Sequence, residues 1–67
     1  MRVSYDPMWR LLQTKELTVS ALCRTTGVAA STFTKIRRNE FVSLEVLARI
    51  ARALECGIDD LLIILDS

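Results

Sequence analysis

Residues 18–38 constrain the fold more strongly than any other part of this sequence. Two short amphipathic segments flank the dipeptide Gly27-Val28. Glycine adopts, without steric strain, the left-handed backbone conformation in which many helices end. The apolar residues placed to touch across this corner are Leu22, Phe33 and Ile36. The segment therefore predicts two helices, at residues 19–26 and 30–38, that cross at a steep angle.

The length and composition allow one small domain. The chain has 67 residues, 51% of them hydrophobic, so residues 1–67 are expected to form a single packed unit. A domain this short buries only about 60% of its unfolded surface, so it gains stability from oligomerisation. The longest apolar run, residues 61–65, is far shorter than the roughly 20 residues that span a bilayer, and the N-terminus lacks a signal peptide's apolar core. We expect a cytoplasmic protein without a membrane partner.

The residue types that most catalytic and metal sites need are missing or isolated. The sequence has no histidine, and its two cysteines, Cys23 and Cys56, form no Cys-x-x-Cys motif. Both cysteines are expected to be small buried apolar residues. Adjacent Asp59 and Asp60 would point about 100° apart on a helix, so they are expected to complement the helix dipole instead of acting as an acid–base pair. We expect no enzymatic activity, no metal and no cofactor.

The basic residues are concentrated in one stretch of the chain. Residues 17–39 hold four basic residues and no acidic one, whereas residues 40–67 hold six acidic residues against two basic ones. The net charge of the whole chain is only +1. A domain polarised in this way can present one face to phosphate and keep the other away from it.

Further elements are expected on both sides of the glycine corner. Asp6-Pro7 is a strong helix start and predicts a helix over residues 7–15. Ser43 opens a helix that runs to Leu54, and Asp59 and Asp60 lie in the first turn of a fifth helix. Alternation of polar and apolar residues over 2–5 predicts a short strand or an extended arm. The apolar tail leaves two outcomes open: residues 63–65 form a strand, or a second copy of the chain buries the segment.

Two helices about a glycine corner form the plan of a helix-turn-helix, which presents its second helix to the major groove of DNA. Residues 17–62 resemble the Cro/C1-type (Xre-like) helix-turn-helix family. The strings that carry the resemblance are Leu22-Cys23-Arg24-Thr25-Thr26-Gly27-Val28, Ser31-Thr32-Phe33-Thr34-Lys35-Ile36, Ser43-Leu44-Glu45-Val46-Leu47, Ala51-Arg52-Ala53-Leu54 and Asp59-Asp60-Leu61-Leu62. The whole chain is similar to very small stand-alone bacterial members, some of which are regulators in mobile elements and resistance operons.

The resemblance implies an all-α domain of five helices that binds operator DNA as a homodimer and regulates transcription. A short N- or C-terminal strand at the dimer interface is compatible with it. The residues that it places at the bases are Ala30, Ser31, Thr32 and Lys35. The candidates for phosphate contact are Thr18, Thr34, Arg37, Arg38 and Asn39. Only Lys35 discriminates strongly between bases, because its ammonium donates to guanine O6 and N7.

The sequence departs from the family's pattern at three positions. Cys23 stands where alanine is common, which is a mild change. Ala29 stands where serine or threonine usually caps the reading helix, so the start of that helix is weakly specified. Arg37 stands where glutamate is frequent, which adds positive charge near DNA.

Most of the candidate residues also fit a purely structural role. Lys35, Arg37 and Arg38 fit an ordinary solvated helix face. Ser31 and Thr32 fit the chemistry of a helix N-terminus without a ligand, and Thr18 fits a simple cap. Trp9 and Tyr5 are expected to pack in the core or at a dimer interface instead of stacking on bases.

The dimer interface is expected at the C-terminal end of the chain. The candidate residues are Leu61, Leu62, Ile63, Ile64 and Leu65, with the arm at residues 3–5 as a second element. The expected partners are operator DNA and a second copy of the chain, and no small-molecule effector is evident. The alternative is a protein-interaction module, of antitoxin or anti-repressor type, that uses the same scaffold without reading DNA.

Overall fold

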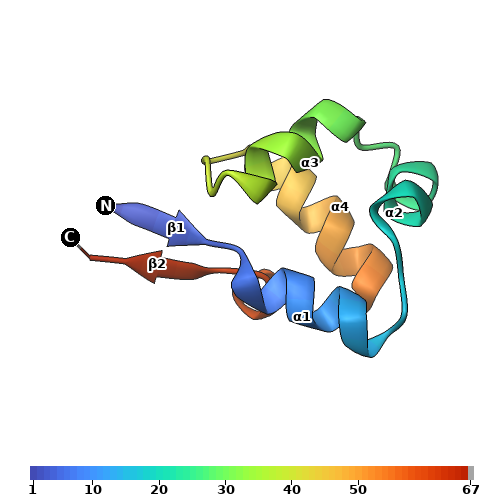
Figure 1. The fold of residues 1–67 in the computed structure, drawn as a ribbon, viewed down its shortest axis with the longest axis horizontal. Helices are drawn as coiled ribbons and strands as arrows, with labels where there is room; N and C mark the ends of the chain where they lie inside the picture. The colour runs from blue at the N-terminus through green and yellow to red at the C-terminus, as the bar shows by residue number, and fades with distance from the viewer. Residues whose placement is uncertain (67) are drawn as a thin grey trace.

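Four α-helices and a pair of short strands make up the fold of residues 1–66, the part of the chain that the computed structural model describes (Figure 1). In chain order the elements are β1 (Arg2–Ser4), α1 (Asp6–Thr14), α2 (Val19–Thr26), α3 (Ala30–Arg37), α4 (Leu44–Leu54), the 3-10 helix η1 (Ile58–Asp60) and β2 (Ile63–Leu65). The predicted bounds of α2 and α4 are confirmed, and α1 and α3 each end one residue earlier than predicted.

Side-chain caps determine where α2 and α4 begin. Thr18 Oγ1 accepts a hydrogen bond from the amide of Ala21 at 3.1 Å, and Ser43 Oγ accepts one from the amide of Val46 at 3.2 Å. Each cap satisfies an amide that has no partner within its own helix. Ala29 occupies the cap position of α3, but its methyl side chain cannot accept a hydrogen bond, so α3 has no side-chain cap.

The start of α1 differs from the prediction by one residue. Tyr5 occupies the cap position and Asp6 is the first helical residue, so Asp6 does not cap this helix. Its carboxylate lies in the first turn, where negative charge complements the helix dipole. Tyr5 is anchored from elsewhere, because its ring is buried and its hydroxyl donates to the Glu40 carbonyl at 2.8 Å. That long-range contact sets the backbone that enters α1.

The prediction of a fifth α-helix is wrong. Residues 58–60 form a single turn of 3-10 helix, closed by a hydrogen bond of 3.0 Å from the Gly57 amide to the Asp60 carboxylate. The chain then becomes extended, and β2 pairs antiparallel with β1 so that Val3 lies opposite Ile64. A continued helix would carry residues 63–65 away from β1 and lose this pairing. The fold is therefore four helices with a strand pair, and both chain ends contribute a strand.

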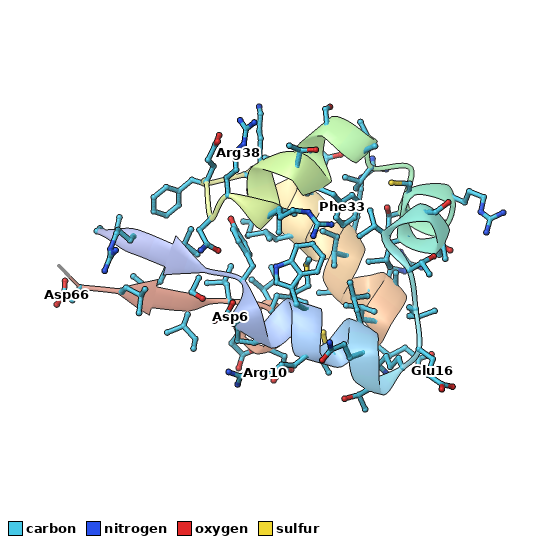
Figure 2. All side chains as sticks on the ribbon, viewed as in Figure 1. Asp6, Arg10, Glu16, Phe33, Arg38 and Asp66 are labelled. Carbon is cyan, nitrogen blue, oxygen red and sulfur yellow. The ribbon has the colours of Figure 1, made fainter. Side chains whose placement is uncertain are left out.

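The core lies among the helices and the base of the strand pair. Its largest fully buried side chains are those of Tyr5, Met8, Phe33, Ile36, Ile50, Leu54 and Leu61. In Figure 1, α2 lies at one end of the domain and the strand pair projects from the other, with both chain termini at its tip. Figure 2 shows Phe33 turned into the interior, whereas Arg10 and Arg38 point outward. Cys23 and Cys56 are free thiols that pack against the core but are only half-buried, so their expected burial is partial.

The buried phenol of Tyr5 leads us to predict that the folded protein loses stability at alkaline pH. Burial raises the pKa of Tyr5 above its ordinary value of 10.0. A phenol with a higher pKa in the folded state contributes stability that is complete below the unfolded pKa and is lost as the pH rises through the folded one. The free energy of unfolding, measured in urea, should therefore fall above about pH 10. Tyr5→Phe should weaken this fall, and it should cost about 1 kcal/mol at neutral pH through the lost hydrogen bond. An unchanged alkaline fall in Tyr5→Phe would contradict the assignment.

Candidate nucleic-acid interface

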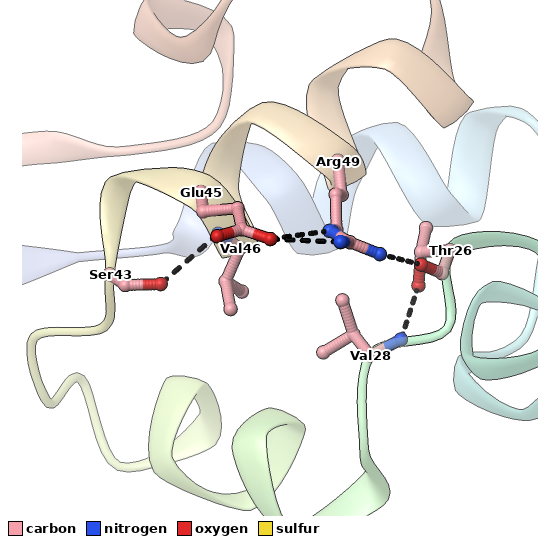
Figure 3. Close-up of polar contacts among 6 residues, drawn as sticks. All are labelled: Thr26, Val28, Ser43, Glu45, Val46 and Arg49. Carbon is pink, nitrogen blue, oxygen red and sulfur yellow. Dashed lines mark hydrogen bonds and ion pairs between the residues drawn. The ribbon is translucent and has the colours of Figure 1, made fainter.

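A left-handed glycine and a buried threonine set the turn between α2 and α3. Gly27 has a φ of 75°, and its amide donates to the Cys23 carbonyl at 3.0 Å. The hydroxyl of Thr26 donates to the Leu22 carbonyl at 2.6 Å. The same hydroxyl accepts from the amide of Val28 at 3.1 Å (Figure 3). One side chain thus joins the last turn of α2 to the backbone that leads into α3, and the predicted corner is confirmed.

Arg49 of α4 contacts the C-terminal end of α2 through a hydrogen bond. Its Nη1 donates to the Thr26 carbonyl at 3.2 Å, while its Nε and Nη2 donate to Oε2 of Glu45 at 3.2 and 2.8 Å (Figure 3). The Glu45–Arg49 pair is exposed to solvent and contributes little stability by itself. Its effect is to orient the guanidinium toward the corner. Sequence reasoning missed this contact, since only the i, i+4 spacing of Glu45 and Arg49 was visible.

The outer face of α3 carries most of the base-reading candidates. Ala30, Ser31 and Lys35 are exposed, whereas Phe33 and Ile36 are buried on the opposite face. Helical spacing also places Arg38 on the same side as residues 31 and 35. Thr32 differs from the other candidates, because it is half-buried and lines a shallow groove with Lys35 against residues 41–43. The structure therefore gathers Ala30, Ser31 and Lys35 on an exposed surface and leaves Thr32 at its edge.

The candidates for phosphate contact have different surroundings. Arg38 is exposed, and its Nη1 lies 3.8 Å from a Glu40 carboxylate oxygen, a solvent-screened contact that a phosphate can replace. Thr34 is exposed on α3 and donates from its hydroxyl to the Ala30 carbonyl at 3.3 Å. Thr18 lies at the start of α2, where its hydroxyl serves as the helix cap.

Asn39 has a structural role that the sequence did not indicate. Its backbone has a left-handed φ of 58°, a conformation that asparagine tolerates better than most residues. Its Oδ1 accepts a hydrogen bond from the amide of Tyr5 at 3.1 Å. Together with the bond from the Tyr5 hydroxyl to Glu40, this contact fastens the end of α3 to the start of α1. Tyr5 thereby belongs to the core, as expected.

Arg37 and Trp9 form a contact that the sequence also did not reveal. The Cζ atom of Arg37 lies 5.0 Å from the centroid of the Trp9 ring, which is the geometry of a cation–π interaction. Trp9 is half-buried and packs against the core, while Arg37 stays exposed. Trp9 therefore packs as expected, but one face of its ring is covered by a cation from α3.

The sequence also raised three other kinds of feature, namely a carboxylate pair, a metal site and a membrane-spanning segment. The Asp60 carboxylate is engaged by the Gly57 amide at the start of the 3-10 turn. No group of three or more Cys, Asp or Glu side chains gathers within residues 1–66 to hold a metal ion. No helix there has the length and apolar character needed to cross a membrane.

One solved structure and one family model match this chain over most of its length. The crystal structure of the transcriptional regulator VanUg, form II, matches it with a TM-score of 0.90 and 39% sequence identity, covering 98% of this chain and 88% of that one. No curated protein matches the sequence. The sequence model of the Cro/C1-type HTH DNA-binding domain matches residues 8–67, which include the whole corner and all four helices except the first two residues of α1. The chain therefore belongs to the family of Cro/C1-type helix-turn-helix DNA-binding domains.

Proposed function

We propose that this protein is a sequence-specific regulator of transcription that binds double-stranded DNA with α3 in the major groove. The observation that carries the proposal is the exposed face of α3, with Ser31, Lys35 and Arg38, on a corner held by Thr26 and Arg49. That face lies in a stretch of the chain with four basic residues and no acidic one. The similarity to VanUg, which is itself a transcriptional regulator, supports the same role.

Each residue of this face has a distinct role in the proposal. Lys35 donates to guanine O6 and N7, Ser31 bonds to any base edge, and the methyl group of Ala30 meets a thymine methyl. Thr32, at the edge of the face, contributes less. Arg37 and Arg38 contact phosphates, with Thr34, Asn39 and the first turn of α2 at Thr18 as additional contacts. Direct reading by one domain is modest, because Lys35 is its one strong discriminator.

A homodimer would double this small set of base contacts. On β2, Ile63, Ile64 and Leu65 are 50%, 54% and 37% exposed. Ile64 lies opposite Val3 and shares its face of the strand pair, whereas Ile63 and Leu65 lie on the other face. Apolar side chains on both faces of a strand are typical of strands that are covered on both sides. A second copy, related by a two-fold axis, is the partner we propose for this strand.

The proposed interface is narrower than the segment 61–65 that the sequence indicated. Leu61 is 0% exposed because the core of a single chain already buries it. Leu62 is half-buried against the same core. A partner would gain contact mainly with residues 63–65.

Ile64→Asp is expected to convert a dimer into a monomer. The substitution places a carboxylate in the middle of an apolar strand, and burying that charge at an interface is strongly unfavourable. Sedimentation equilibrium at high micromolar concentration should show a dimer for the wild type and a monomer for the variant. Leu44→Asp is the matched control, since Leu44 is also exposed but lies in the first turn of α4, where an acid is tolerated. A wild-type monomer at high micromolar concentration would exclude this interface.

Selection of bound sequences from a random DNA pool, at two salt concentrations, tests the proposed function. A dimeric regulator should enrich a palindrome whose half-sites lie about 34 Å apart. Its affinity should fall steeply with added salt, because phosphate contacts release counterions. Absence of enrichment at either salt concentration would contradict DNA reading and favour a protein-interaction module on the same scaffold.

A further inference from the structure

We propose that Trp9 is a positioning residue for a DNA phosphate contact, and that it acts by holding the guanidinium of Arg37. The inference rests on the DNA-binding function proposed above and adds a residue of α1 to it. The Cζ atom of Arg37 lies 5.0 Å from the centroid of the indole ring. Arg37 comes from the last turn of α3 and Trp9 from the first turns of α1, so the contact joins two helices.

The contact with the indole ring leaves hydrogen-bond donors of the Arg37 guanidinium available. The N–H groups of arginine lie in the plane of the guanidinium and point outward from its rim. Arginine has five such N–H donors, and a single aromatic ring cannot occupy all of them, so several remain directed at the surroundings. Arg37 is exposed, and no carboxylate in residues 1–66 forms an ion pair with it. A phosphate oxygen pair, which binds in the plane of the guanidinium, does not compete with the indole ring.

The groove around this pair lies beside the start of α2. Trp9 and Arg37 line it together with Leu17 and Val19, the first residue of α2. The first amides of a helix have no partner within the helix and attract anions. Glu16 also lines the groove and is the one acidic residue there. Because Arg37 contacts Trp9 in this groove, a phosphate near the start of α2 would meet a guanidinium that is already oriented.

An arginine side chain that is already oriented in the free protein raises the affinity for DNA, because less of its conformational freedom is lost on binding. Arginine has a long side chain whose ordering is costly when no neighbour restrains it. The indole ring restrains it in the free protein. A lysine at position 37 would keep the charge but would lose the planar group that stacks and donates in two directions.

The test is a double-mutant cycle in binding to a short DNA duplex of random sequence at low ionic strength. Trp9→Leu should weaken binding about two- to fivefold, the range typical of an exposed cation–π contact. In an Arg37→Gln background the same substitution should have no effect. Trp9→Phe, which retains an aromatic face, should restore most of the lost affinity. Arg52→Gln is the matched control for charge, since Arg52 is exposed on α4 and lies outside the proposed contact.

The fluorescence of Trp9 supplies a readout that a merely structural role would not change. Trp9 is the single tryptophan of the chain. Addition of the duplex should alter its emission in the wild type and in Arg52→Gln but not in Arg37→Gln. This measurement needs no substitution at Trp9, so it stands even if Trp9→Leu impairs folding.

Two outcomes would overturn the inference, and they differ from failure of the proposed function. If Trp9→Leu weakens duplex binding equally with and without Arg37, Trp9 acts through the general stability of the fold. If the duplex leaves the emission of Trp9 unchanged in the wild type, no phosphate reaches the pair. Both results apply to a protein that binds DNA. A wild-type protein that binds no duplex at low salt would instead refute the proposed function, and the inference with it.

Discussion

Replacement of Lys35 and Arg38 together by alanine should lower affinity for the selected operator on the order of a hundredfold. Both side chains are exposed on one side of α3, and neither belongs to the core. Loss of a lysine–guanine contact costs about 1–3 kcal/mol and is specific to the base that it reads. In the proposed complex Arg38 contacts a phosphate, so its loss should lower the salt dependence of binding by about one unit of slope per protomer. Fluorescence anisotropy over a series of salt concentrations measures both effects.

The matched control removes the same charge from other helices. Arg10 and Arg52 are exposed on α1 and α4. Their joint replacement by alanine should change affinity by only a few fold, through the long-range field of the protein. If the control weakens binding as much as the Lys35 and Arg38 pair does, net charge and not α3 determines the affinity. If the Lys35 and Arg38 variant keeps full affinity, α3 is not the reading helix.

Phe33→Ala is expected to unfold a large fraction of the protein. Phe33 is 2% exposed and is one of the largest buried side chains of the core. Truncation of a buried phenylalanine costs about 3–5 kcal/mol, through lost apolar burial and the cavity left behind. A domain of 67 residues has a total stability of roughly 3–10 kcal/mol, so the substitution removes a large part of it. Urea denaturation followed by helical circular dichroism measures the change.

The chain contains its own control for this substitution. Phe41, the other phenylalanine, lies between α3 and α4 and is 57% exposed. Phe41→Ala should alter the free energy of unfolding by less than about 1 kcal/mol, because little apolar surface is lost from the interior. Equal destabilisation by the two substitutions would show that Phe33 is not a central core residue. Both variants should be compared at the same protein concentration, because a dimer is stabilised by concentration.

Local signals in the sequence predicted the corner correctly. Gly27, Thr18 and Ser43 act through backbone groups within a few residues of themselves, so their effects do not depend on the rest of the fold. The same holds for the alternation of Phe33 and Ile36 with exposed residues along α3. These signals also helped to indicate the family, since the corner carries part of the resemblance and the strings at 43–47, 51–54 and 59–62 carry the rest.

The contacts that orient the candidate interface were not visible in the sequence. Arg49 reaches the carbonyl of Thr26, and the Tyr5 hydroxyl reaches that of Glu40. Each pair is far apart in the chain and joins a side chain to a backbone group, which every residue possesses. No pattern of residue types marks such a pair. Arg37 and Trp9 are likewise far apart in the sequence and are brought together only by the tertiary structure.

The sequence by itself determined the helix-turn-helix, the basic stretch around it and the exposed face of α3. Short-range chemistry is sufficient for these features, because caps, a left-handed glycine and helical periodicity act locally. Only the tertiary structure decided that residues 63–65 form a strand and that Leu61 belongs to the core. An apolar run such as residues 61–65 fits a helix or a strand equally well, and its choice depends on the partner it finds. Here β1 supplies that partner from the opposite end of the chain.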